Sequence, residues 1–133
     1  MSAGFALANL VVQILLIVAV GGGAVVARVR RFRRHCLIMR SAMAVQIFAI
    51  GLVMAPSLAG YLNNWHGWSL FLTRVIVHQS LGVIVVLLFI YINLAYTGVI
   101  RAPRSFRPYM ISALTLWVIS LVTGVLLYWR IWV

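Results

Sequence analysis

The sequence predicts an all-α membrane protein, a four-transmembrane-helix up-and-down bundle with both termini on the outer face of the membrane. Three observations lead to this prediction. The chain of 133 residues is 65% hydrophobic, with a mean hydropathy of +1.14. Its apolar residues form four runs that each reach the roughly 20 residues needed to cross a bilayer as a helix. All eleven of its formal charges are arginines, and most of them lie in short stretches between these runs.

The four apolar runs fill most of the chain, so we expect one domain over residues 1–133 and no soluble module. The N-terminus is uncharged and the first run is long, which favours a retained helix over a cleaved signal peptide. No sheet is expected, because an open strand edge cannot face lipid. The predicted spans are residues 5–27, 36–60, 69–96 and 109–129.

The arginines predict the orientation, because positive residues in short loops stay on the cytoplasmic side. The first and third connections are arginine-rich, whereas the middle connection carries Trp65, His66 and Trp68, which fit an interfacial aromatic belt. A basic cluster between two spans predicts contact with anionic lipid headgroups, about 1 kcal/mol per arginine, and not nucleic-acid binding. The arginines expected to make this contact are Arg28, Arg30, Arg31, Arg33, Arg34, Arg101, Arg104 and Arg107.

The chain has no aspartate or glutamate, and this absence excludes several classes of function. Carboxylate acid/base catalysis is closed to it, as are carboxylate cages for Mg²⁺ or Ca²⁺. Small multidrug-type transporters depend on a glutamate within the membrane, which this chain lacks. We therefore expect a protein that is not an enzyme and has no soluble substrate.

Small residues recur once per helical turn in the first two spans, as Ala19, Gly23 and Ala27 and as Gly51, Ala55 and Ala59. Such strips let helix backbones approach closely. We expect both strips to pack inside the bundle, with a partner-subunit interface as the alternative for one of them. Pro56 lacks a backbone donor and predicts a kink near Leu52.

Polar side chains within the spans are candidates for function, because each costs free energy unless it is paired. For Gln13, Gln46, Gln79 and Asn93 we expect hydrogen bonds between helices, worth about 0.6 kcal/mol each. Arg74, His78 and Gly82 share one helical face and suggest a site for haem b. The imidazole would bind iron, the glycine would admit the macrocycle, and the arginine would pair with a propionate. The alternative is that all three are structural.

A haem held by two histidines needs a second imidazole at the depth of His78. His35 is expected about 15 Å away along the membrane normal, from the rise of 1.5 Å per residue. His66 is on the correct side, and a folded-back loop could bring it near, or another subunit could supply the second ligand. A shared or five-coordinate haem site is therefore expected if haem is bound. A weaker metal hypothesis is a copper site formed by His35, Cys36, Met39 and Met43, because imidazole and soft sulfur suit Cu(I).

Several short motifs together resemble the small four-helix membrane proteins of the CtaM/YozB type. These motifs are Arg33-Arg34-His35 with Met39, His78 early in the third span, a basic third connection, and Thr123-Gly124 with Tyr128. That family is associated with the assembly or function of haem-copper terminal oxidases. The resemblance implies a role beside respiratory complexes in a prokaryotic cytoplasmic (inner) membrane. The chain departs from the family at Arg104-Ser105-Phe106-Arg107, where the pattern has a histidine.

These observations predict a non-catalytic subunit or assembly factor of a respiratory or redox membrane complex, similar to a terminal oxidase, with haem b at His78 as an added hypothesis. Its expected partners are other membrane subunits and anionic lipids, and not nucleic acid. The alternative is a cofactor-free structural accessory subunit of another membrane enzyme.

Overall fold

The computed structural model describes residues 3–63, 67 and 69–132 and is 88% helical, with no strand among these residues. The helices form four rods. The second rod is continuous, because a π-helical segment, η1, joins α2 to α3. The elements are α1 (Ala3–Arg28), α2 (Phe32–Ala49), η1 (Ile50–Met54), α3 (Ala55–Asn63), α4 (Leu70–Tyr96) and α5 (Arg107–Trp132). The all-helical prediction is confirmed.

Four helical segments are long and apolar enough to cross a membrane: Gly4–Arg28, Phe32–Gly60, Leu70–Tyr96 and Arg107–Arg130. Each coincides with one predicted span. The second begins earlier than expected, at Phe32, which places Arg33, Arg34 and His35 in its first turn. The N-cap, Arg31, has no side-chain capping bond, and the first turn has no acidic residue.

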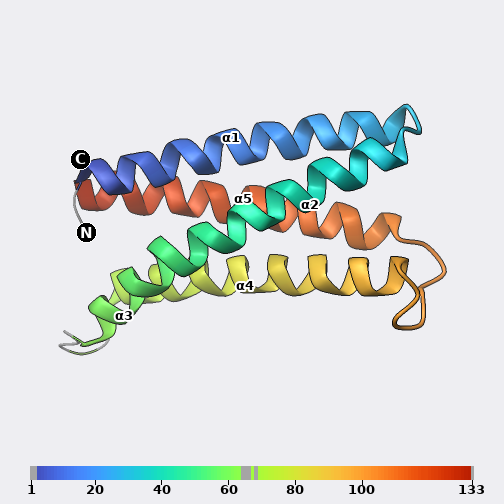
Figure 1. Cartoon of the computed structure of the whole chain (residues 1–133). Helices are drawn as coiled ribbons and strands as arrows, with labels where there is room; N and C mark the ends of the chain where they lie inside the picture. The colour runs from blue at the N-terminus through green and yellow to red at the C-terminus, as the bar shows by residue number, and fades with distance from the viewer. Residues whose placement is uncertain (1–2, 64–66, 68, 133) are drawn as a thin grey trace.

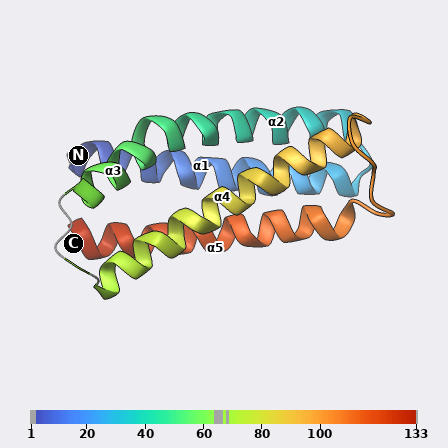
Figure 2. The same ribbon diagram turned by 90° about the horizontal axis from the view of Figure 1, so that it is seen from below.

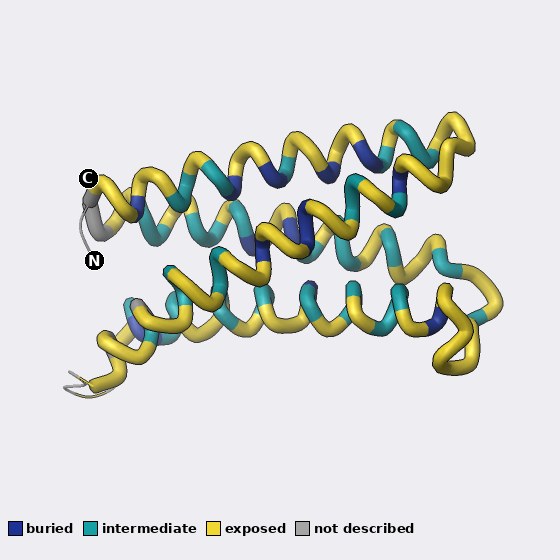
Figure 3. The backbone as a smooth tube through the Cα atoms, in the orientation of Figure 1, coloured by how far each residue is buried: buried dark blue, intermediate teal, exposed yellow. Residues whose placement is uncertain are grey.

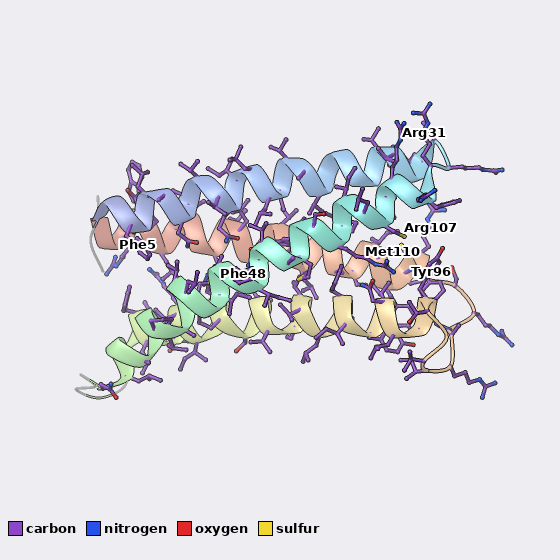
Figure 4. The ribbon with its side chains drawn as sticks, in the orientation of Figure 1. Phe5, Arg31, Phe48, Tyr96, Arg107 and Met110 are labelled. Carbon is purple, nitrogen blue, oxygen red and sulfur yellow. The ribbon has the colours of Figure 1, made fainter. Side chains whose placement is uncertain are left out.

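The rods run alternately up and down (Figures 1 and 2). α1 packs against both α2 and α5, and α4 packs against α5, whereas α2 and α4 touch at few points. The connections 29–31 and 97–106 lie at one end of the bundle, called here the arginine end. The two termini lie at the opposite, terminal end. Figure 4 shows Arg31 and Arg107 at the arginine end and Phe5 at the terminal end.

The buried core lies midway along the bundle and receives side chains from all four rods (Figure 3). Most large apolar side chains outside this core are exposed on the outer surface, as suits a helix bundle surrounded by lipid. The core cluster consists of Leu16, Val20, Ala42, Met43, Val85 and Trp117.

The two strips of small residues have different outcomes. In the first, Gly23 is buried, and a Cβ there would lie 3.1 Å from side-chain atoms of both Ile38 and Met39, so α1 and α2 approach closely at this point. Ala19 of the same strip is exposed. The prediction for the second strip was wrong, because Gly51, Ala55 and Ala59 are all exposed. A Cβ at Gly51 would meet no described atom within 4 Å.

Near Leu52, where a kink was predicted, the structure has a π-helical turn, Ile50–Met54. The N–H of Ala55 donates to the carbonyl of Ile50, five residues earlier. Pro56 follows at once and has no N–H to continue the α-helical pattern. Single π-turns of this kind often occur at functional sites, and three residues of this one line the cavity described below.

The two helices that lead into the arginine end stop in the same way. After α1, the N–H of Arg31 donates to Val26 and that of Arg30 to Ala27. After α4, Val99 and Gly98 repeat this pair of bonds with Leu94 and Ala95. This arrangement puts one residue in the left-handed region, Gly98 at φ 83° and Arg30 at φ 60°. Glycine is the usual residue there, because a Cβ is strained in that conformation.

We expect Arg30→Gly to raise the free energy of unfolding by about 1 kcal/mol and Gly98→Ala to lower it by about the same amount, because the left-handed conformation costs a residue with a Cβ about 1–2 kcal/mol. The measurement is equilibrium unfolding of the purified protein in mixed detergent micelles. Changes of the same sign in the two variants would contradict this account of the helix ends.

Candidate functional site

A cavity of about 160 Å³ lies between the four rods, in the half of the bundle nearer the terminal end. Residues of the core cluster lie one turn farther toward the arginine end, where Leu16 follows Gln13 on α1 and Met43 precedes Gln46 on α2. The polar side chains in the wall come from every rod, and the remaining wall is mainly apolar. These polar residues are Asn9, Gln13, Gln46, His78, Gln79, Ser120 and Tyr128.

Two amide atoms in this wall lack partners. Nε2 of Gln13 and Oε1 of Gln46 are buried without a hydrogen-bond partner among the described residues. The side chains themselves are only 8% and 6% exposed. The bonds predicted between helices are therefore not formed by these two atoms. A buried polar atom left unpaired costs about 1–3 kcal/mol, so these atoms are suited to a polar ligand or to water.

His78 is half-buried and is held by α5. The hydroxyl of Thr123 donates to the carbonyl of Ser120 at 2.8 Å, so the hydroxyl oxygen must accept from Nδ1 of His78, 2.9 Å away. When the imidazole is neutral, donation from Nδ1 places the lone pair on Nε2. The bond to Thr123 uses Nδ1, which leaves Nε2 on the other edge of a ring that lines the cavity. Nε2 is the atom through which His78 could bind a metal or accept a hydrogen bond.

Gly124 determines how closely the His78 ring can approach α5. A Cβ at this position would lie 3.0 Å from Cε1 of the ring and 3.6 Å from Nε2. Sequence reasoning included Thr123 and Gly124 only through the family resemblance. Nothing in the local pattern of α5 indicates that they hold an imidazole from α4.

We expect Gly124→Ala to displace the His78 ring and break its bond to Thr123, at a cost of about 1–3 kcal/mol, which is typical of overpacking. Equilibrium unfolding measures the cost, and the imidazole nitrogen resonances report the lost bond. The matched control is Gly82→Ala, because a Cβ at Gly82 meets no described atom within 4 Å. Equal effects of the two substitutions would contradict the contact.

The structure brings together part of the residue set predicted for haem. His78 and Gly82 line the same cavity, and the space beside Gly82 is open. Arg74 is exposed and is not part of the cavity wall, and His66 lies outside the described residues. A buried cavity of about 150 Å³ admits one benzene ring, so a cavity of about 160 Å³ does not enclose a porphyrin. The haem site therefore stays a prediction, and it would need more space than this cavity offers.

The residues proposed for copper are divided among three places. Nδ1 of His35 donates to the carbonyl of Gly23 at 2.8 Å, and Met39 packs beside the same glycine. Met43 belongs to the core cluster, whereas Cys36 lines a separate hollow. The described residues contain no group of three or more histidine, cysteine or acidic side chains that could hold a metal ion.

The separate hollow, of about 670 Å³, is at the arginine end and is lined by Phe32, Arg33, Arg34, Cys36, Leu37, Arg40 and Tyr96. Arg40 is held there, because its Nε donates to Oδ1 of Asn93 at 2.9 Å and thereby links α2 to α4. Arginines at the start of α2 oppose its helix dipole, and the chain has no carboxylate to neutralise them. The hollow therefore attracts anions.

Comparisons with protein-family models, with curated proteins and with solved structures find no match for this chain. The resemblance to the CtaM/YozB type therefore stays a prediction. The geometry by itself shows a mainly apolar cavity with several polar side chains in one half of the bundle and an arginine-lined hollow at the arginine end.

Proposed function

We propose that this chain is a non-catalytic integral membrane subunit or assembly factor of a respiratory or redox membrane complex. In this proposal the four rods cross a prokaryotic cytoplasmic (inner) membrane. The arginine end faces the cytoplasm and the two termini face outward. The four apolar helices support insertion into a membrane, and the gathering of all arginines except Arg74 and Arg130 toward the arginine end supports the direction.

One observation carries the proposed role, namely the cavity that is lined by His78 and by Gln13 and Gln46, whose Nε2 and Oε1 atoms are buried without a partner among the described residues. Polar groups at membrane depth are costly and usually mark a functional site. Because the chain has no carboxylate, we assign this cavity to ligand binding and not to catalysis. The arginine-lined hollow supports a second proposed partner, anionic lipid headgroups.

The test is gentle purification of the complex through this chain, followed by mass spectrometry of the copurifying subunits and oxidised and dithionite-reduced absorption spectra. We expect subunits of a respiratory enzyme to copurify. We expect no haem band from the isolated chain, because the cavity does not enclose a porphyrin. A Soret band lost in His78→Ala would instead place a haem between this chain and a partner. The absence of any respiratory or redox subunit would overturn the proposal.

A second candidate is a cofactor-free structural subunit, which the exposed strip of Gly51, Ala55 and Ala59 favours. A strip of this kind lets another transmembrane helix approach closely. Under this alternative, Gly51→Leu should release the copurifying subunits, whereas His78→Ala should leave them bound. The opposite pattern would favour the cavity as the site that matters.

A further inference from the structure

Three polar residues, Gln13, Gln46 and His78, line the cavity between the four rods. Nε2 of Gln13 and Oε1 of Gln46 have no partner within the described part of the chain, and the bond of His78 to Thr123 uses Nδ1 and not Nε2. Nε2 of Gln13 is a donor, whereas Oε1 of Gln46 and Nε2 of His78 are acceptors. The two glutamines are 8% and 6% exposed, so they have little access to solvent. A ligand that satisfies all three atoms must offer two hydrogens and one lone pair.

The size and composition of the wall restrict the ligand further. A volume of about 160 Å³ corresponds to one six-membered ring, because a cavity of about 150 Å³ admits benzene. The described part of the wall contains no arginine to hold an anion, and no side chain in the sequence is a carboxylate that could hold a cation. Burying an unpaired charge is very costly. The ligand is therefore neutral, one ring wide and rich in hydroxyl groups.

We propose that this cavity binds the head group of a quinol, a neutral ring with two opposite hydroxyls and an apolar tail. One hydroxyl donates to Nε2 of His78. The other donates to Oε1 of Gln46 and accepts from Nε2 of Gln13. The tail lies along the apolar wall, and the loosely packed side between α2 and α4 is where it enters from lipid. The inference rests on the proposed function for the membrane setting and on the cavity for the ligand.

The pattern of donors and acceptors distinguishes the reduced ring from the oxidised one. A quinone has two carbonyl oxygens, which can only accept, so it pairs with Gln13 but leaves the acceptors of Gln46 and His78 unpaired. A buried hydrogen bond left unmade lowers affinity by about tenfold or more. We therefore expect the quinol to bind at least about tenfold more tightly than the quinone.

The experiment is anaerobic titration calorimetry of the purified full chain in lipid nanodiscs. The probes are a decyl-substituted ubiquinol, its quinone, and tailless hydroquinone, which separates a lipid-borne ring from a water-soluble one. We expect saturable binding of the quinol at one per chain and weaker binding of the tailless ring. Gln46→Leu and His78→Ala should each lower the affinity at least about tenfold. Ser80→Ala, at an exposed position on α4, should leave it unchanged.

Three outcomes would overturn the proposal. Equal affinity for quinol and quinone would show that the acceptor atoms of Gln46 and His78 make no hydrogen bonds with the hydroxyl groups of the ring. Quinol uptake that does not saturate would show that the quinol partitions into lipid and that the cavity holds only water. Uptake that is unchanged in Gln46→Leu would show the same. Tighter binding of tailless hydroquinone would assign the ring to a water-soluble source. Quinol binding without copurifying respiratory subunits would overturn the proposed function and leave the ligand proposal standing. Copurifying respiratory subunits without quinol binding would overturn the ligand proposal and leave the proposed function standing.

Discussion

Met43→Ala is expected to lower the free energy of unfolding by about 3 kcal/mol, within the roughly 2–5 kcal/mol range for truncating a buried methionine. Met43 is 1% exposed and lies in the core cluster that side chains from all four rods form. In the proposed membrane setting the loss comes mainly from missing van der Waals contacts, because lipid offers no hydrophobic driving force for helix association. Equilibrium unfolding in mixed micelles measures the change.

Val45→Ala is the matched control, because Val45 lies two residues away on the same helix and is 45% exposed. A substitution on the outer face should change the free energy of unfolding by less than about 0.5 kcal/mol. A loss at Val45 as large as that at Met43 would mean that the outer face of α2 is covered by another subunit or copy and is not in contact with lipid.

Gln46→Leu is expected to have the opposite sign and to raise the free energy of unfolding of the ligand-free protein by about 1–3 kcal/mol. The substitution removes a buried acceptor that has no partner among the described residues, and such an atom costs about that much when left unpaired. Gln13→Leu should act in the same direction. The double variant should not be additive, because both side chains line one cavity.

Equilibrium unfolding without added quinol measures this gain, and the exposed Ser80→Ala again serves as the control. A loss of stability in Gln46→Leu would mean that water in the cavity already satisfies Oε1. A gain in stability together with lost quinol binding would show that these glutamines are kept for their ligand. Stability given up at a functional site is a common feature of proteins.

The local pattern of the chain was sufficient to predict the helices. Apolar runs of spanning length determine where each helix lies, and the described structure has a long apolar helix at each predicted position. Pro56 also indicated where the second rod becomes irregular, although not that the irregularity would be a π-turn. The prediction failed for Gly51, Ala55 and Ala59, because small residues at helical spacing allow close packing without indicating whether a partner is present.

The candidate site depended on contacts between residues far apart in the chain. His78 could be identified as a polar residue in an apolar span, but its support from Thr123 comes from a position 45 residues later. The unpaired state of Gln13 and Gln46 was also beyond sequence reasoning, because an amide in a span is usually expected to find a partner. Cavity volume, which decided against an enclosed haem, depends on the packing of all four rods.

The sequence by itself determined the helical class, the four rods and the segregation of arginine, because composition and hydrophobic run length act locally along the chain. Only the tertiary structure decided which polar atoms meet, which remain unpaired and how large a ligand the space between them accepts. The physical reason is that these properties depend on helix rotation and crossing, which are set by side-chain packing between rods and not by the pattern of any one rod.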